Sequence, residues 1–492
     1  MDKISMLYKI PEPPTKTPEN TVYNLSLDRT MDISCSDIKA QRYFLKIASS
    51  PLTIKENIMY RRQILSDLMN NRGMYYELYD ILGKFYDIGR YNERERKYRF
   101  STKHNDEEVS FGNTRQALEM TAITTKKVFE ILKELYEFLD SKDIKSEGFL
   151  TLKSRVGRIV KSPSYDELWD ICSYFCTIPD IESVESCMSI DYDGNIYISR
   201  LVSCNEERAA PKSKGFFGIG KKKNAEQEPA YEKKRLTGIS LPFGNSVMYA
   251  AFSEPAKILD YIITSIFEEF GGVRDELMFY KAGLKFCMFL DEKKVPYVFP
   301  EIVEEPMFEC KDLYDTYLCA YYTSMEGVVP NDAVIGSTEQ GILVYGKNNT
   351  GKTVYLRSIG TAQLFAQAGF PVTAREAKIG IRSGIFTQFA ASEKEFEEGN
   401  EAGRFEQEVR EIAALVERSD ENALILFNET FQTTAYSEGA EGLYHVLRYL
   451  SSVRTHWVLV THLSGLLGRF SGGVTTLKTT DRYKLEKDKI AL

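Results

Sequence analysis

The spacing of apolar residues predicts long helices over much of the first two thirds of the chain. Between residues 114 and 142 apolar side chains recur every three or four positions, which is the spacing of a helical stripe. The members of this stripe are Val128, Ile131, Leu132, Leu135, Phe138 and Leu139. Residues 36–85 and 255–292 show similar patterns, and Ser50-Pro51 interrupts the first of them.

A β-leaning region separates these helical regions. Residues 188–192 and 196–202 flank Asp193-Gly194-Asn195, which is a strong hairpin signal. Lysine and glycine then dominate residues 205–235, whose composition cannot bury a core, so we expect a flexible loop there. Two interpretations of this basic loop stay open. It grips a polyanion, with help from Phe216 and Phe217, or it is a solvated insertion without a ligand.

From residue 319 onward the pattern changes to α/β. Short apolar runs at 342–345, 423–427 and 457–460 alternate with helical patterns. This is the order expected of a parallel sheet whose strands are joined by helical crossovers.

A glycine-rich stretch follows the first apolar run and precedes a helical pattern, which is the context of a phosphate-binding P-loop. Its two glycines allow a tight turn and close approach to an anion, and backbone N–H groups at the helix start point at the phosphates. Lys352 would hold the β- and γ-phosphates, and Thr353 would ligate Mg²⁺. The alternative is a chance match in a glycine turn. The predicted phosphate-binding residues are Gly346, Lys347, Asn348, Asn349, Thr350, Gly351, Lys352 and Thr353.

Polar residues follow the other two apolar runs. Glu429 ends the second run and is the candidate for the carboxylate that polarises the attacking water. Asn428 precedes it, where many such enzymes have an aspartate that helps hold Mg²⁺ through water, so we expect weaker metal binding or slower turnover. His462 follows the third run, from which it can reach a γ-phosphate or the water. The alternatives are a simple loop start for Asn428-Glu429 and a capping or packing role for His462.

Arg404 stands at the start of a further helical pattern, where a basic group can meet phosphate. A surface arginine without a ligand is the alternative. The remaining histidines, His104, His445 and His456, have no such context, and we expect them to be structural.

Composition narrows the classes of protein. With 492 residues the chain is long enough for about three domains. Its net charge of -8 gives no general attraction to nucleic acid, so any such contact needs a local basic patch. The first residues lack the apolar core of a signal peptide, and no apolar run is long enough to span a membrane, which indicates a cytoplasmic protein. The eight scattered cysteines are expected to be buried free thiols in a reducing cytosol.

Several motifs taken together resemble the MutS family of DNA mismatch-repair ATPases. Val328-Val329-Pro330-Asn331-Asp332 precedes the P-loop strand, and Tyr355-Leu356-Arg357 follows the loop. The later motifs, in the family's order, are Ile379-Gly380, Ile385-Phe386-Thr387, Phe405 with Glu408, Asn428-Glu429 and Thr461-His462. The resemblance is specific over about residues 326–465 and diffuse over about 40–325.

The resemblance implies an α/β plus all-α fold. A C-terminal P-loop ATPase domain of the ABC type would be attached to a long helical lever with a small β-rich, clamp-like insertion. The implied divisions are an irregular lead-in at 1–23, the first part of the helical core at 24–183, the insertion at 184–250 with its basic loop at about 205–235, the returning lever helices at 251–318 and the ATPase domain at 319–492.

The resemblance also implies an ATP-switched dimeric clamp on branched or duplex DNA, of the mismatch-repair or recombination type, with ATP and Mg²⁺ as cofactors and no membrane. Glu429 would be the catalytic carboxylate and His462 the switch histidine of the third strand. Each subunit of a homodimer would contribute a signature loop to its partner's nucleotide.

Some features depart from the family pattern. The mismatch-reading N-terminal domain has no counterpart, so we do not expect direct mismatch reading. We also expect no C-terminal dimerisation module after His462. Gly403 aligns with the signature serine, and we expect Arg404 to touch the partner's γ-phosphate in its place. The altered positions Gly403 and Asn428, together with the acidic net charge, favour an alternative function. This is a slow or inactive nucleotide-binding scaffold that acts through a protein or ribosomal partner.

Overall fold

The computed structural model of the chain describes residues 3–15, 17–99, 111–176, 181–190, 196–206, 242–336, 339–389, 401–431, 436–470 and 472–488. The chain divides into two compact units. Unit 1 comprises Met1, Gly83–Tyr136 and Val156–Gly271, and unit 2 comprises Asp2–Leu82, Glu137–Arg155 and Gly272–Leu492.

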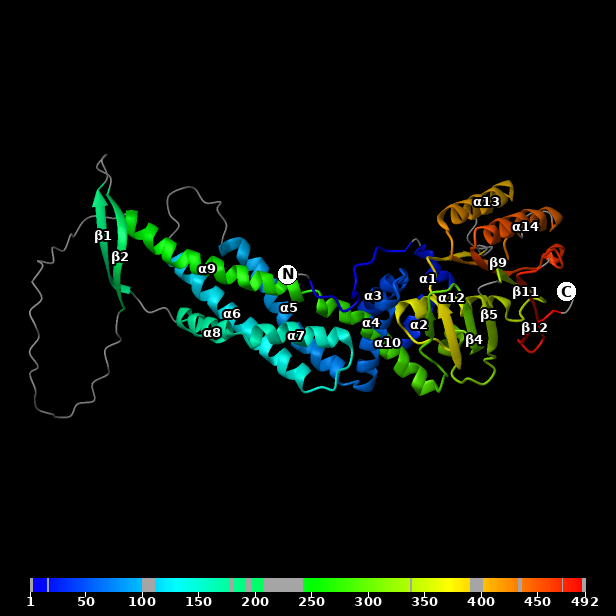
Figure 1. The fold of residues 1–492 in the computed structure, drawn as a ribbon, viewed down its shortest axis with the longest axis horizontal. Helices are drawn as coiled ribbons and strands as arrows, with labels where there is room; N and C mark the ends of the chain where they lie inside the picture. Colours follow the sequence, from blue (N-terminus) through cyan, green and yellow to red (C-terminus); the bar gives the residue numbers. More distant parts are fainter. Residues whose placement is uncertain are drawn as a thin grey trace, which may run out of the picture. The chain divides into compact units, whose positions relative to one another are not determined.

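Unit 1 is built mainly from long helices, coloured blue, cyan and green in Figure 1. Its helices are α8 (Pro163–Phe175), α9 (Pro242–Phe270) and parts of α5 (Met74–Arg99), α6 (Phe111–Asp140) and α7 (Glu147–Val160). Leu118 and Ala122 of α6 pack against Cys172 of α8 and against Ala256 and Leu259 of α9. The helical stripe predicted within 114–142 is therefore confirmed as part of a helix that buries apolar residues.

The predicted hairpin is formed by β1 (Ile181–Ile190) and β2 (Ile196–Glu206), which pair antiparallel from Ile190 opposite Ile196 onward. The turn at Asp193-Gly194-Asn195 and nearly all of the predicted basic loop lie outside the described residues. None of the helices in the described ranges has both the length and the apolar content to span a bilayer.

The N-terminal part of unit 2 is also helical. Its helices are α1 (Asn20–Asn24), α2 (Leu27–Ser34), α3 (Ile38–Ala48), α4 (Lys55–Asn70) and α10 (Val273–Lys293). The gap between α3 and α4 contains Ser50-Pro51, as the sequence predicted. Although residues 3–15 form no helix or strand, Asn57 binds the backbone of Lys9 and Ile10, and Glu276 accepts a hydrogen bond from Ser5. This segment is therefore fixed to the helices of the unit.

A six-stranded sheet forms the centre of unit 2, with the strand order β12-β11-β6-β10-β9-β8. The strands are β6 (Gly341–Tyr345), β8 (Ile385–Phe389), β9 (Leu424–Asn428), β10 (His456–Val460), β11 (Val474–Thr479) and β12 (Leu485–Lys487). All neighbours pair in parallel except β11 and β12. The three predicted apolar runs are β6, β9 and β10, and β10 lies between the other two. Their carboxyl ends consequently meet at one edge of the sheet.

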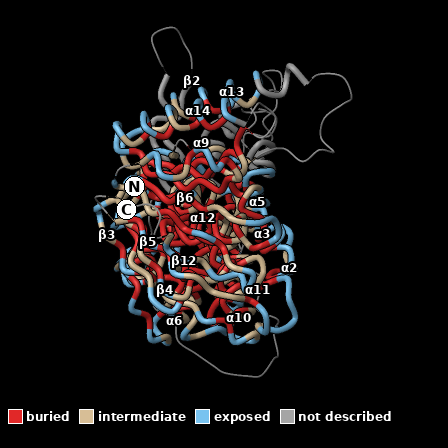
Figure 2. The backbone as a smooth tube through the Cα atoms, turned by 90° about the vertical axis from the view of Figure 1, so that its right-hand side faces the viewer, coloured by how far each residue is buried: buried red, intermediate tan, exposed pale blue. Residues whose placement is uncertain are grey.

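Three helices alternate with these strands along the chain. They are α12 (Lys352–Ala368), α13 (Glu401–Arg418) and α14 (Tyr436–Ser452). Helix α12 is buried along almost its whole length, and the tube around its label in Figure 2 is mostly red. Aromatic rings join it to the N-terminal helices, because Phe365 at the end of α12 packs edge-on against Phe44 of α3 at a centroid distance of 6.1 Å.

A second sheet of four strands was not predicted. It has the order β3-β7-β4-β5, formed by β3 (Glu301–Val303), β4 (Phe308–Leu313), β5 (Asn331–Ile335) and β7 (Glu376–Gly380). Helix α11 (Thr316–Tyr321) follows β4, and the short 3-10 helix η2 (Ser464–Leu466) follows β10. The six described cysteines are free thiols, and burial is the main cause of a raised pKa in all five of the buried ones. Free thiols agree with the prediction for these six residues.

Candidate functional site

The loop between β6 and α12 has a backbone that needs glycine at two positions. Gly346 has a φ of 144°, and a Cβ atom placed on it would lie 2.0 Å from Thr479 Oγ1. Gly351 has a φ of 88° and is the N-cap residue of α12. Side chains larger than hydrogen would therefore clash at the first position and strain the backbone at both. The loop thus brings backbone N–H groups to the start of a helix, where an anion is favoured.

The neighbouring strand β11 supports this loop from one side. Thr350 Oγ1 donates to Lys347 O at 2.7 Å and lies 2.5 Å from Thr479 Oγ1. Beyond β11, Asn331 binds both Tyr483 O, at 3.0 Å, and Leu485 N, at 2.9 Å. The sequence showed the motif that contains Asn331 but gave no sign of these partners, because they are 152 and 154 residues away.

Lys352 is the buried cation of the site. Its side chain is 5% exposed, and Nζ donates to the carbonyl oxygens of Gly346 at 3.0 Å and Lys347 at 2.9 Å. Burial lowers the pKa of Lys352, and the nearby carboxylate of Glu429, at 3.8 Å, acts in the opposite direction. A desolvated ammonium group of this kind is well suited to bind phosphate oxygens.

Thr353 and Asn428 lie together at the carboxyl end of β9. Thr353 Oγ1 donates to Asn428 Oδ1 at 2.9 Å. In the described part of the chain no group of three or more His, Cys, Asp or Glu residues can hold a metal ion. A hydroxyl and an amide oxygen nevertheless fit Mg²⁺, because this ion keeps several waters and takes further oxygens from phosphates.

Glu429 and His462 form the polar pair beside the lysine. Glu429 Oε1 lies 2.9 Å from His462 Nε2, which is itself 3.2 Å from Lys352 Nζ. The single Nε2 atom can donate a proton to Glu429 or accept a hydrogen bond from Lys352, but not both at once. The structure thus brings together three side chains that the sequence placed after three different strands.

Arg404 lies in the first turn of α13, as the sequence predicted from the helical pattern. Its side chain and that of Phe405 lie outside the part of the structure that is described, so their contacts stay predictions. The structure describes two of the three histidines that we expected to be structural, His456 and His445. His456 is buried in β10 against Arg382, and His445 lies on the surface 3.0 Å from Glu441.

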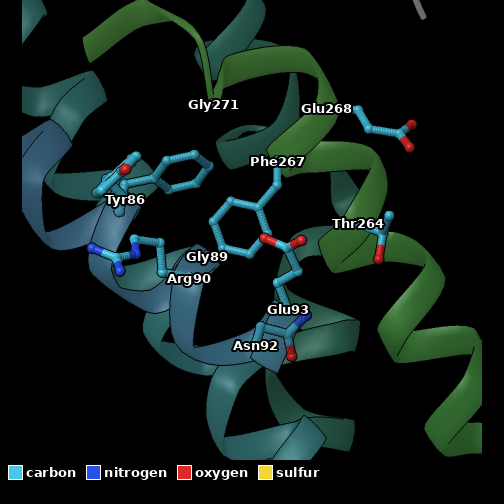
Figure 3. Close-up of a pocket in the computed structure, with 10 residues that line it drawn as sticks. Tyr86, Gly89, Arg90, Asn92, Glu93, Thr264, Phe267, Glu268 and Gly271 are labelled. Atoms are coloured by element: carbon cyan, nitrogen blue, oxygen red, sulfur yellow. The ribbon is translucent and has the colours of Figure 1, made fainter. Parts of the chain in front are cut away.

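Unit 1 contains a pocket of about 450 Å³ between α5 and α9. Figure 3 shows the Phe267 ring at its centre, with Tyr86, Arg90 and Glu93 around it. The rings of Phe85 and Phe267 are 4.6 Å apart, and a Cβ atom on Gly89 would lie 3.0 Å from the Phe267 ring. The residues that line this pocket include none of those that the sequence assigned to nucleotide chemistry. Because Gly89 has no side chain, the Phe267 ring can lie close to the backbone of α5 at this pocket.

The parallel sheet, the glycine loop and the polar groups at one sheet edge define the fold class of a P-loop ATPase domain. Residues 342–486 match the family model for MutS domain V. The chain is related to the MutS family: a helical N-terminal region precedes an α/β region that matches this ATPase domain, and distant MutS homologues match over most of the chain.

Relatives extend the similarity beyond the ATPase domain. The chain is 24% identical over 469 residues to the DNA mismatch repair protein MutS of Caldanaerobacter subterraneus subsp. tengcongensis, which covers 88% of this chain and 51% of that protein. It is 34% identical over 134 residues to MutS of Synechococcus sp. (strain CC9902), covering 27% of this chain and 14% of that protein. It is 32% identical over 164 residues to MutS of Chlorobaculum tepidum, covering 32% of this chain and 18% of that protein. The chain thus spans about half the length of the first of these relatives.

Proposed function

We propose that this chain is an ATPase that uses ATP binding to switch a dimeric clamp on DNA. The observation that carries the proposal is the convergence of Lys352, Glu429 and His462 at the end of the P-loop, with separations of 2.9 to 3.8 Å. The match to MutS domain V and the relation to DNA mismatch repair proteins support the same class of function. ATP is the substrate, and the reaction is hydrolysis of its terminal phosphoanhydride bond.

The residues of the P-loop bind the phosphates. Lys352 exchanges its carbonyl partners in the loop for the β- and γ-phosphate oxygens, and this exchange is favourable because phosphate carries a full negative charge. The loop amides and the start of α12 add fixed positive potential at the same place. Asn348 and Asn349 belong to the loop, in which Asn349 has a left-handed φ of 60°.

Thr353 and Asn428 would hold Mg²⁺, directly and through water. The ion supplies neutralisation of phosphate charge when bound. Asn428 offers an oxygen without a charge, so it holds a hydrated cation less strongly than a carboxylate does. Slow turnover follows from this difference.

Glu429 orients the attacking water and accepts its proton. His462 Nε2 lies 2.9 Å from Glu429 Oε1, where it would fix the carboxylate and respond to the γ-phosphate.

The proposed binding partners, a second copy of the chain and DNA, follow the family pattern. Two copies of the chain would face each other across nucleotide, and Arg404 of each would reach the γ-phosphate bound by the other in place of a signature serine. The helices and the β1–β2 hairpin would serve as lever and clamp on branched or duplex DNA. The basic residues that follow β2 provide the local positive charge that such contact needs.

A second candidate function is a nucleotide-binding scaffold that hydrolyses slowly or not at all and acts through a protein or ribosomal partner. The neutral Asn428 beside Thr353 is the observation that favours it.

The test compares the purified full chain with its Lys352→Ala variant and with the exposed-site control Lys133→Ala. We expect the first substitution to weaken ATP binding by about 100-fold, the loss of one strong charged contact, and the control to leave it unchanged. Hydrolysis is then measured with duplex, junction and single-stranded DNA. ATP-dependent DNA binding that stimulates hydrolysis supports the clamp, ATP binding with neither effect supports the scaffold, and unchanged nucleotide affinity in Lys352→Ala contradicts both.

A further inference from the structure

The turn that carries Glu429 has an unusual backbone. Glu429 has a φ of 57° and Phe431 a φ of 62°, so two residues of a three-residue turn are left-handed although neither is glycine. Left-handed side-chain-bearing residues are disfavoured and persist only where their surroundings hold them. The contacts that hold this turn therefore decide where the carboxylate of Glu429 points.

Each residue of the turn makes a hydrogen bond to a neighbouring element. Glu429 N donates to Val460 O of β10 at 2.9 Å, and Thr430 Oγ1 donates to Gln388 Oε1 of β8. The third hydrogen bond is different, because Phe431 N donates to Glu408 Oε2 at 3.0 Å. The first two come from strands of the central sheet, whereas Glu408 belongs to helix α13.

Helix α13 also holds the turn by packing. The Phe431 ring is 5% exposed and shares a core cluster with Ile412 and Leu415 of the same helix. Glu408 is half-buried, and burial raises its pKa while the hydrogen bond from Phe431 N works against the rise. The left-handed residue Phe431 is thus fixed to α13 by both its amide and its ring.

We propose that Glu408 is a positioning residue for ATP hydrolysis, which holds the 429–431 turn so that the carboxylate of Glu429 faces the attacking water. The inference rests on the proposed function of Glu429. Glu408 follows Arg404 by four positions, which is about one helical turn. A shift at the start of α13 therefore reaches Glu429 through two contacts, the Glu408 hydrogen bond and the Phe431 ring. In the proposed dimer the partner's nucleotide supplies such a shift.

The decisive variants separate a hydrogen-bond acceptor from bulk and charge. Glu408→Ala removes the acceptor, Glu408→Gln keeps an acceptor oxygen without the charge, and Glu417→Ala is the matched control at an exposed position of the same helix. Single-turnover hydrolysis and ATP affinity are measured on the full chain. We expect Glu408→Ala to lower the hydrolysis rate by about 100-fold, the effect of misplacing a catalytic group by about 1 Å. ATP affinity is expected to stay within about threefold, because only the chemical step needs the turn.

The hydrolysis rate of Glu408→Gln separates the proposed role from a general loss of structure. Glu408→Gln is expected to hydrolyse ATP within about threefold of the parent rate, since its amide oxygen still accepts from Phe431 N. A parent-like rate in Glu408→Ala, a Gln variant as slow as the Ala variant, or a slow Ala variant with weakened ATP binding would each overturn the proposal.

Backbone amide exchange keeps this test independent of hydrolysis. The Phe431 amide is expected to exchange about tenfold faster or more in Glu408→Ala and at the parent rate in the Gln and control variants. If Glu429→Gln leaves the parent's hydrolysis rate unchanged, the proposed function of Glu429 fails. The exchange measurement then still tests the hydrogen bond to Glu408, and equal exchange in Glu408→Ala and the parent overturns its role.

Discussion

Asn428 is the residue whose chemistry sets the expected speed of this site. It occupies the end of a buried strand and accepts a hydrogen bond from Thr353, the hydroxyl assigned to the metal. A carboxylate at the same position would keep this hydrogen bond and add a negative charge next to a divalent cation. The residue type was visible in the sequence. Its contact with Thr353 was not, because only the fold brings the start of α12 to the end of β9.

We expect Asn428→Asp to increase single-turnover hydrolysis about tenfold, because a charged ligand binds Mg²⁺ more tightly. The measurement is ATP hydrolysis over a Mg²⁺ titration, in which the midpoint should fall to lower concentration. Asn20→Asp, at an exposed position of α1, is the matched control. An unchanged or slower rate in Asn428→Asp would count against the assignment of Asn428 to the metal site.

His456 is a second residue whose environment predicts a measurable effect. It is buried in β10, where it accepts a hydrogen bond from Arg382. Burial first, and the positive charge of Arg382 second, lower the pKa of His456 from 6.5 to about 3. Between these two values the unfolded chain binds a proton that the folded chain does not. The folded state is therefore favoured fully above pH 6.5 and progressively less as the pH falls toward 3.

We expect the free energy of unfolding to fall by up to about 1.4 kcal/mol for each pH unit below 6 through this single group. His456→Gln keeps an acceptor without a titrating ring, so its stability should depend less on pH. Urea unfolding at several values between pH 4.5 and 7 measures both slopes. Equal slopes in parent and variant would show that His456 is not the group responsible.

At the scale of elements, the sequence predicted the helices and strands with strong periodicity. The strands β6, β9 and β10 and the helices α3, α4, α6 and α10 fall where their apolar spacing placed them. The second sheet escaped notice because charged residues interrupt each of its strands and none is an unbroken apolar run, unlike β6, β9 and β10. Strands of this kind owe their stability to their neighbours more than to their own pattern.

Helix α12 shows how closely the element after the P-loop is packed. A Cβ atom on Gly360 would lie 2.5 Å from Leu426 of β9 and 2.6 Å from Leu25. The glycine therefore permits the helix to approach both the sheet and the N-terminal segment. Sequence alone suggests only a weakened helix at this position.

We expect Gly360→Ala to lower the free energy of unfolding by about 1 to 3 kcal/mol, because the added methyl group overpacks this contact. Gly442→Ala in α14 is the matched control, since its nearest neighbour would be at 3.7 Å, an ordinary contact distance. The control should be neutral or stabilising by up to about 1 kcal/mol through helix propensity. Chemical denaturation measures both variants, and equal effects would contradict the packing argument.

At the scale of the whole molecule, charge distribution matters more than total charge. The chain carries a net charge of -8, yet residues 211–235 contain eight basic and three acidic residues. DNA attracts such a segment through its phosphates, and release of bound counterions makes the affinity salt-dependent. The segment lies outside the described residues, so its role is predicted from sequence.

We expect replacement of residues 211–235 by a Gly/Ser linker of equal length to weaken DNA binding and flatten its salt dependence. Each lost phosphate contact should reduce the slope of log affinity against log salt by about 0.9. Fluorescence anisotropy with labelled DNA measures this slope. The salt concentration is varied from about 50 to 200 mM, where the affinity of such contacts changes strongly. ATP hydrolysis without DNA serves as the control. An unchanged slope would assign this segment to solvation.

The sequence by itself determined the class of the C-terminal domain and its main chemistry. A glycine loop between an apolar run and a helical pattern specifies a phosphate site locally, since its geometry depends on adjacent residues. Tertiary structure decided which distant groups complete that site. Thr479 lies beside Gly346 because β11 pairs with β6, and His462 contacts Glu429 because β10 pairs with β9. Glu408 reaches Phe431 from helix α13, which lies outside the sheet. Side-chain partners separated by many residues follow from strand order and helix packing, which no local pattern encodes.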